Sequence, residues 1–209
     1  MTHTKLKTLT LTILSSLTLA ACAGTNAPIG SPAPVVPAKT VVPGDKPSAD
    51  RATIRDALAA KRRLQIDRLT AYSDAGVFPL NREEPGMLNV FIDDAGSICA
   101  AANLMWQDGQ ADLVRKTAVA DNYLRLATVS SGPLMDWMLT SGLTQGEIDR
   151  IQEPYSFIDE PEPQLIASEA KRLQAHFATV IAELNNNWDA SLDAATDKLM
   201  ANSSLLAGL

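Results

Sequence analysis

The sequence predicts a mostly α-helical protein: a compact bundle of two long helices enclosing several short helices, with at most one short strand or hairpin. Apolar residues recur at three- and four-residue steps over 49–74 and again over 166–199, which is the period of an amphipathic helix. Prolines and glycines divide the stretch between them into short segments. Residues 49–209 are enough for one helical domain with a hydrophobic core.

The N-terminus has the parts of a secretory signal peptide. Lys5 and Lys7 precede an uncharged run from Leu9 to Leu19, and small residues follow it. The run is too short to span a bilayer as a helix, which needs about 20 apolar residues. Cleavage at an ordinary signal-peptide site would leave Cys22 as a plain thiol of the mature chain.

The tetrapeptide Leu19-Ala20-Ala21-Cys22 resembles the lipobox of bacterial lipoproteins. The resemblance implies that residues 1–21 are removed and that the Cys22 thiol is acylated, so the membrane is a partner through this lipid anchor. In that family an Asp after the cysteine often retains the protein at the inner membrane, and this chain has Ala23 there. The resemblance therefore implies the outer membrane, with the domain facing the periplasm.

Residues 22–48 predict a tether without a fold. Six prolines are interleaved with small residues, and aromatic side chains are absent. Proline removes a backbone donor and fixes φ, so an extended chain is expected. The tether could hold the domain towards the peptidoglycan, or it could be a generic spacer.

The first long helix is predicted at 49–74, where glycine and proline are absent, and Gly76 is in the expected place for its end. Its polar face carries six basic residues: Arg51, Arg55, Lys61, Arg62, Arg63 and Arg68. This face could contact anionic lipid or glycan. Alternatively it pairs with acidic residues of the same domain, because charged helix faces are the default in soluble proteins.

The middle of the chain predicts short elements. Residues 77–88 form a loop, 89–92 is either a short strand or an extended lead-in, and Ser97 caps a helix to about Asp108. Further short helices are expected at 111–121, 133–140 and 144–152. The second begins with proline and the third with a capping box of Thr144 and Glu147. Residues 123–129 could be helical or extended.

The second long helix is predicted from the periodic residues between Ile166 and Leu199, over about thirty residues or more. A kink is expected near Asn185-Asn186-Asn187, because asparagine side chains compete for backbone hydrogen bonds. The two long helices should pack together and enclose the short ones.

Cys99 is the strongest candidate for chemistry. It lies in the first turn of a predicted helix, where free amides and the helix dipole lower the pKa of a thiol, as a redox cysteine requires. The alternative is a buried structural thiol. The following Ala100-Ala101-Ala102 and the lack of a second free cysteine favour that alternative.

Asp93, Asp94 and His176 are weaker candidates. The two carboxylates could serve a metal or acid–base chemistry, but they do not fit an EF-hand loop, and a turn closed by Asp is the alternative. His176 could belong to a Ser-His-Asp triad, yet G-x-S-x-G is absent and its place beside an apolar seam favours a helix-flank residue. One mature histidine and one free cysteine make no zinc set, so no metal or cofactor is expected.

Two further observations bear on partners. Trp106, Trp137 and Trp188 lie on predicted helices, where they could line a groove for a peptide or glycan or belong to the core. The chain has 18 Lys and Arg against 24 Asp and Glu. This acidity argues against nucleic acid as a partner, because binding to phosphates needs clustered basic residues.

A spaced pattern runs through the middle third of the chain. It consists of Asn89-Val90-Phe91-Ile92-Asp93, Gly96, Cys99-Ala100, Leu104, Asp112-Leu113-Val114, Asn122, Trp137, Ser141-Gly142-Leu143-Thr144, Glu147 and Ile151-Gln152. The pattern resembles a group of uncharacterised bacterial envelope proteins of unknown function. The resemblance implies an envelope protein, and because the group has no known activity, it carries over no catalytic residue.

These features predict a lipid-anchored periplasmic interaction or structural protein, not an enzyme, that docks on an envelope complex or on peptidoglycan. One alternative is a thiol-based redox or other enzyme centred on Cys99. Another is a carrier of a small apolar ligand between the helices.

Overall fold

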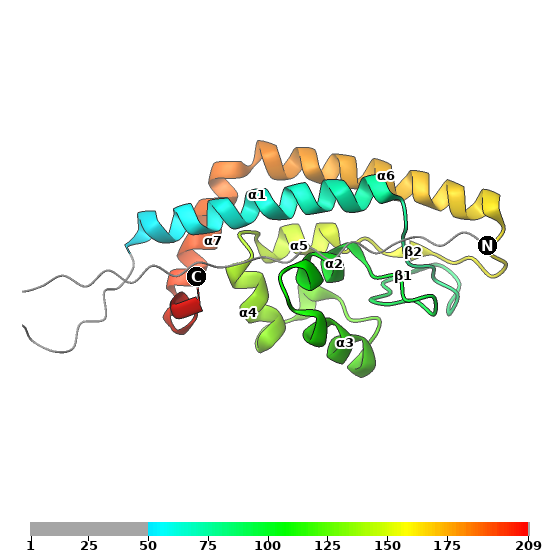
Figure 1. Cartoon of the computed structure of the whole chain (residues 1–209), viewed down its shortest axis with the longest axis horizontal. Coiled ribbons are helices and arrows are strands. Elements are labelled where there is room, and N and C mark those ends of the chain that lie inside the picture. Colours follow the sequence, from blue (N-terminus) through cyan, green and yellow to red (C-terminus); the bar gives the residue numbers. More distant parts are fainter. Residues whose placement is uncertain (1–49, 209) are drawn as a thin grey trace, which may run out of the picture. The chain divides into compact units, whose positions relative to one another are not determined.

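The computed structural model describes residues 50–208. The predicted signal peptide and tether, Cys22 included, lie outside these residues. The described part contains seven α-helices, two short 3-10 helices and one two-stranded antiparallel sheet, so the protein is mostly α-helical, as predicted. Helices α1 (Arg51–Ala75) and α6 (Pro163–Asn186) lie side by side, with the short helices gathered on one side of them (Figure 1).

Helix α1 matches its predicted bounds closely. The Asp50 carboxylate accepts a hydrogen bond from the Thr53 amide at 2.7 Å and caps the start. Gly76, with φ of 64°, ends the helix at the predicted position. The face that includes Leu58 and Leu69 is fully buried, which confirms the apolar periodicity.

The predicted long C-terminal helix is two helices. Helix α6 ends at Asn186, and α7 (Trp188–Met200) begins after Asn187 and runs in a different direction (Figure 1). The side-chain amide of Asn185 donates to the Ile181 carbonyl at 2.8 Å, as expected of asparagine in a helix. Most of the apolar seam from Leu173 to Leu199 is buried, Ile181 and Trp188 are partly buried, and Ile166 is exposed.

Short elements make up the rest of the described chain. They are α2 (Ala100–Gln107), α3 (Ala111–Ala120), η1 (Leu126–Thr128), α4 (Pro133–Thr140), α5 (Gln145–Ile151) and η2 (Ser203–Gly208). The predicted cap of α2 was wrong. Cys99, not Ser97, is its N-cap, because the Cys99 sulfur accepts from the Ala102 amide while the Ser97 amide donates to Asp93.

The sheet pairs β1 (Met87–Leu88) with β2 (Tyr155–Ser156). The first strand thus precedes the stretch 89–92, which is an extended lead-in with a single bridge between Ile92 and Ile98. The second strand had no signal in the sequence, since two residues are too few to show alternation.

The basic face of α1 pairs with acidic residues of the same domain. Arg55 lies 2.7 Å from Asp189 and 2.9 Å from Asp193. Further pairs join Arg51 to Asp193 and Asp197, Arg62 to Glu147, and Arg68 to Asp108. This confirms pairing within the domain for four of the six basic residues. No helix in residues 50–208 combines the length and the apolar character needed to cross a membrane.

Candidate binding pocket

A buried ion pair fixes the turn between α4 and α5 against α1. Arg62 is 0% exposed, and its guanidinium donates to both carboxylate oxygens of Glu147, at 2.6 and 2.9 Å. It also donates to the carbonyl oxygens of Gly142, at 3.3 Å, and Leu184, at 2.8 Å. One side chain therefore joins α1, the α4–α5 turn and the end of α6 through charge-assisted hydrogen bonds.

Glu147 is held ionised in this position. Burial raises the pKa of its carboxyl group, but the hydrogen bonds from Arg62 and Thr144 outweigh burial, and the pKa lies below its ordinary 4.5. Glu147 also completes the predicted capping box. Its carboxylate accepts from the Thr144 amide at 2.8 Å, and the Thr144 hydroxyl accepts from the Glu147 amide at 3.2 Å.

Gly142 allows this turn to approach α1. Its φ is 82°, and a Cβ at this position would clash with the Leu58 carbonyl oxygen and lie 2.6 Å from the Arg62 nitrogen. Glycine is the residue that meets both conditions. The corner between α4 and α5 is thus set by Gly142, Arg62 and Glu147 together.

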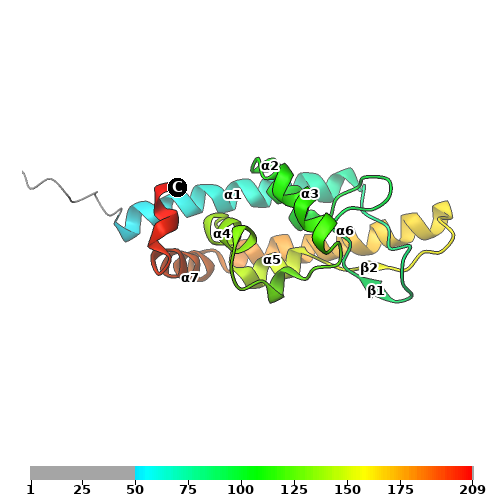
Figure 2. The same ribbon diagram turned by 90° about the horizontal axis from the view of Figure 1, so that it is seen from below.

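Beside this corner, α4, α5 and α7 enclose a pocket of about 420 Å³. Figure 2 shows these helices from below, with α7 next to α4. The floor is formed by buried apolar residues: Met138, Leu139, Leu143 and Ala195. The volume and the lining are typical of small-ligand sites, which measure roughly 300–1,000 Å³ and are mostly hydrophobic.

Met135 and Met138 lie one turn apart on α4 and both line the pocket. Met135 is only partly buried. Methionine is unbranched and polarizable, so it adapts its shape to different apolar groups. The partly exposed Met135 side chain can therefore adjust to a ligand, whereas Met138 is held in the core and the α4–α5 corner is fixed.

Most polar groups at the rim are already engaged. The side-chain amide of Gln145 donates to the carbonyls of Leu126, at 3.0 Å, and Val129, at 2.7 Å. Asp149 forms an ion pair with Arg125 at 3.6 Å. Lys198 is exposed at the rim, and its ammonium group forms no ion pair with any residue of 50–208.

Cys99 lies in the core and is 1% exposed. Burial raises the pKa of its thiol to about 12, although hydrogen bonds from the Ala102 and Ala101 amides act in the opposite direction. The thiol is therefore protonated at neutral pH, and the thiolate is the form that reacts. This geometry agrees with the buried structural thiol considered from the sequence.

Asp93 closes a turn. Its carboxylate accepts from the amides of Leu80, Ala95 and Ser97, at 3.1, 3.0 and 2.8 Å. Asp94 is exposed, and both carboxylates border a groove of about 300 Å³. Over residues 50–208, no three side chains of His, Cys, Asp or Glu are grouped so that they could hold a metal ion.

His176 flanks the apolar seam of α6. Its Nε2 lies 2.8 Å from the Arg150 carbonyl oxygen and 3.5 Å from the Glu153 carboxylate, and its ring contacts Phe177 edge to face. The helix-flank interpretation agrees with this position. Neither His176 nor Cys99, Asp93 or Asp94 lines the apolar pocket.

The three tryptophans do not form the groove considered from the sequence. Trp137 is buried and donates to Asp108 at 2.9 Å, while Trp188 lies 5.6 Å from the Arg62 guanidinium. Trp106 is exposed and lies under Arg115 at 4.5 Å. None of them lines the pocket between α4, α5 and α7.

Sequence reasoning missed the residues of the pocket. The one signal that could have drawn attention is the pair of methionines, Met135 and Met138, on an eight-residue helix. No sequence pattern marks Lys198 as a lysine without a carboxylate partner, because this depends on how distant helices pack together.

Comparison of the chain with protein-family models, with curated proteins and with solved structures finds no match in any of the three.

Proposed function

We propose that the chain is a lipid-anchored interaction protein of the bacterial outer membrane. Its helical domain faces the periplasm and binds an apolar group of an envelope component in the pocket between α4, α5 and α7. The anchor at Cys22 and the tether are predictions from the sequence. The apolar floor of Met138, Leu139, Leu143 and Ala195 is the observation that carries the binding role.

The apolar floor favours a lipid or an apolar protein segment over peptidoglycan. Covering apolar surface contributes roughly 25 cal/mol per Å². The polar sugars of peptidoglycan gain little from such a floor, and burying their hydroxyl groups without hydrogen bonds costs free energy. Peptidoglycan therefore does not match the chemistry of this pocket.

The site favours binding over catalysis. Thr144 and Asp149 at the rim are already paired within the protein, and the floor carries no nucleophile or general base. Cys99, the centre of the redox alternative, is buried and protonated. A role through non-covalent contact is what this arrangement supports.

Binding of an apolar fluorescent dye tests the proposal. N-phenyl-1-naphthylamine is titrated into the full chain carrying Cys22→Ser, which removes the predicted lipid. We expect saturable binding at one site. Ala194→Trp, an exposed position at the pocket wall, should weaken it by about tenfold or more, that is about 1.4 kcal/mol, because the indole fills the mouth.

Ala178→Trp is the matched control, since Ala178 is also an exposed helical alanine but does not line the pocket. This variant should bind the dye as the unsubstituted chain does. Absence of saturable binding, or equal effects of the two tryptophans, would contradict the proposed site.

A further inference from the structure

The acidic residue that lines the pocket and its acidic neighbours on α7 and α5 are paired with arginines. Asp149 at the rim pairs with Arg125. On α7, Asp193 and Asp197 pair with arginines of α1, and behind the corner Glu147 pairs with Arg62. Among the charged groups that line the pocket, Lys198 is thus the cation without a partner in residues 50–208.

Lys198 is well placed to meet a ligand at the mouth. It lies in the last turn of α7, three and four residues after Ala195 and Ala194, and all three line the pocket. Residues at this spacing share one face of a helix. The aliphatic stem of the lysine can therefore lie along the alanine wall while its ammonium group stays in water.

Resting on the proposed function, we propose that the ligand is a single-chain amphiphile with an anionic head group. Its tail lies on the floor of Met138, Leu139, Leu143 and Ala195, and its head pairs with Lys198. An unpaired cation beside an apolar floor complements this charge pattern. The partly exposed Met135 can adjust its side chain to the tail.

The chemistry shared by the candidate ligands is a tail joined to a carboxylate or a phosphate. Ammonium pairs with either group, so the head is distinguished by measurement and not by the geometry. A neutral head would leave Lys198 unpaired, and a cationic head would be repelled by it.

Displacement of the bound dye by four amphiphiles with the same tail tests this inference. The competitors are dodecanoate, dodecyl phosphate, dodecanol and dodecylammonium, used with the full Cys22→Ser chain. The three ionic competitors are kept below the concentrations at which they form micelles, and dodecanol is kept below its solubility limit. At least one anion should displace half of the dye at a concentration about threefold to fivefold lower than dodecanol needs. The expected difference is this small because the ion pair is partly exposed. Dodecylammonium should be the weakest.

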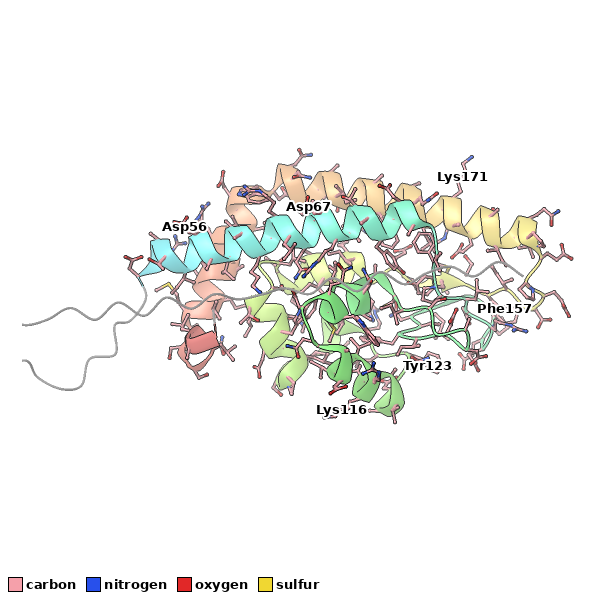
Figure 3. The ribbon with its side chains drawn as sticks, in the orientation of Figure 1. Asp56, Asp67, Lys116, Tyr123, Phe157 and Lys171 are labelled. Atoms are coloured by element: carbon pink, nitrogen blue, oxygen red, sulfur yellow. The ribbon has the colours of Figure 1, made fainter. Side chains whose placement is uncertain are left out.

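Lys198→Met should abolish the preference for an anion. Displacement of the dye by dodecanol should not change, because its neutral head does not pair with the ammonium group. Lys171→Met is the control, because Lys171 lies on α6, is exposed and points away from the short helices (Figure 3). This variant should keep the preference. A stronger effect of dodecanoate supports a fatty acid, and a stronger effect of dodecyl phosphate supports a phosphate-headed lipid.

The outcomes separate the two proposals. If the dye binds but the four competitors act equally, or if Lys198→Met keeps the preference, the anionic ligand is wrong and the pocket assignment stands. If neither dye nor amphiphile binds, both are wrong.

Discussion

Arg62 shows how a single residue can hold several parts of this domain together. Its guanidinium is fully buried and reaches Glu147, Gly142 and Leu184. Its Nε has no hydrogen-bond partner within residues 50–208. Removing one partner of a buried pair leaves the other charge without compensation, which costs about 3–5 kcal/mol.

Glu147→Gln should therefore lower the free energy of unfolding by about 3 kcal/mol at pH 7. The folded-state pKa of Glu147 lies below its ordinary 4.5, because the hydrogen bonds from Arg62 and Thr144 outweigh burial. A depressed folded pKa gives stability that is present above pH 4.5 and lost as the pH falls through the folded value. The difference between the two proteins, measured by urea unfolding from pH 7 to pH 3, should shrink over that acidic range.

Glu183→Gln is the matched control. Glu183 also pairs with an arginine, Arg150 at 3.3 Å, but both side chains are about half exposed. Its loss should cost about 1 kcal/mol or less. Equal costs for the two substitutions at pH 7, or a cost of Glu147→Gln that does not change with pH, would contradict the role given to the buried pair.

At Cys99, two opposing effects decide the state of the thiol. Its position at the start of a helix could be predicted from the sequence, and the structure places it there as the N-cap. Its burial depends on helices that are distant in the sequence. The neighbouring alanines favoured a buried position but could not establish it. Burial is the larger effect, so local pattern alone could not settle the reactivity.

Among the elements, those with a long period or a strong local signal could be predicted. Helices α1, α4 and α5 were predicted, because capping residues and helix-ending residues flank them in the sequence. The two-residue strands were not, since β1 pairs with a segment about 70 residues away. The pocket was missed for the same reason: residues of α4, α5 and α7 line it together only because the chain folds back on itself.

The close approach of the α4–α5 turn to α1 can be tested with two glycines. Gly142 and Gly109 follow the C-caps of α4 and α2, with φ of 82° and 80°. Alanine at either position is strained by about 1–2 kcal/mol. Gly142→Ala should cost about 3 kcal/mol more, because its Cβ also meets the backbone of α1.

Thermal and urea unfolding of the two variants measure this difference. At Gly109 an added Cβ meets nothing within 4 Å, so its cost isolates the backbone strain. Equal destabilisation of both variants would mean that the turn does not touch α1 as described.

For the whole molecule, the proposed function joins an anchor to a binding domain. Cys22→Ser should move the protein from the salt-washed membrane fraction to the soluble fraction and abolish labelling by an alkyne fatty acid. Cys99→Ala should leave both unchanged, because its thiol is buried in the domain. Fatty-acid labelling of the Cys22→Ser protein, or its retention in the washed membrane, would contradict the anchor.

The partners of α1 also bear on when this domain can fold. Its arginines pair with residues as far as 146 positions later, and its apolar face packs on α6 and α7. Contacts between distant residues form slowly, and here they cannot form until the C-terminal helices are available. A nascent chain of this design stays open until α6 and α7 have been made, which would suit the export that the proposed function requires.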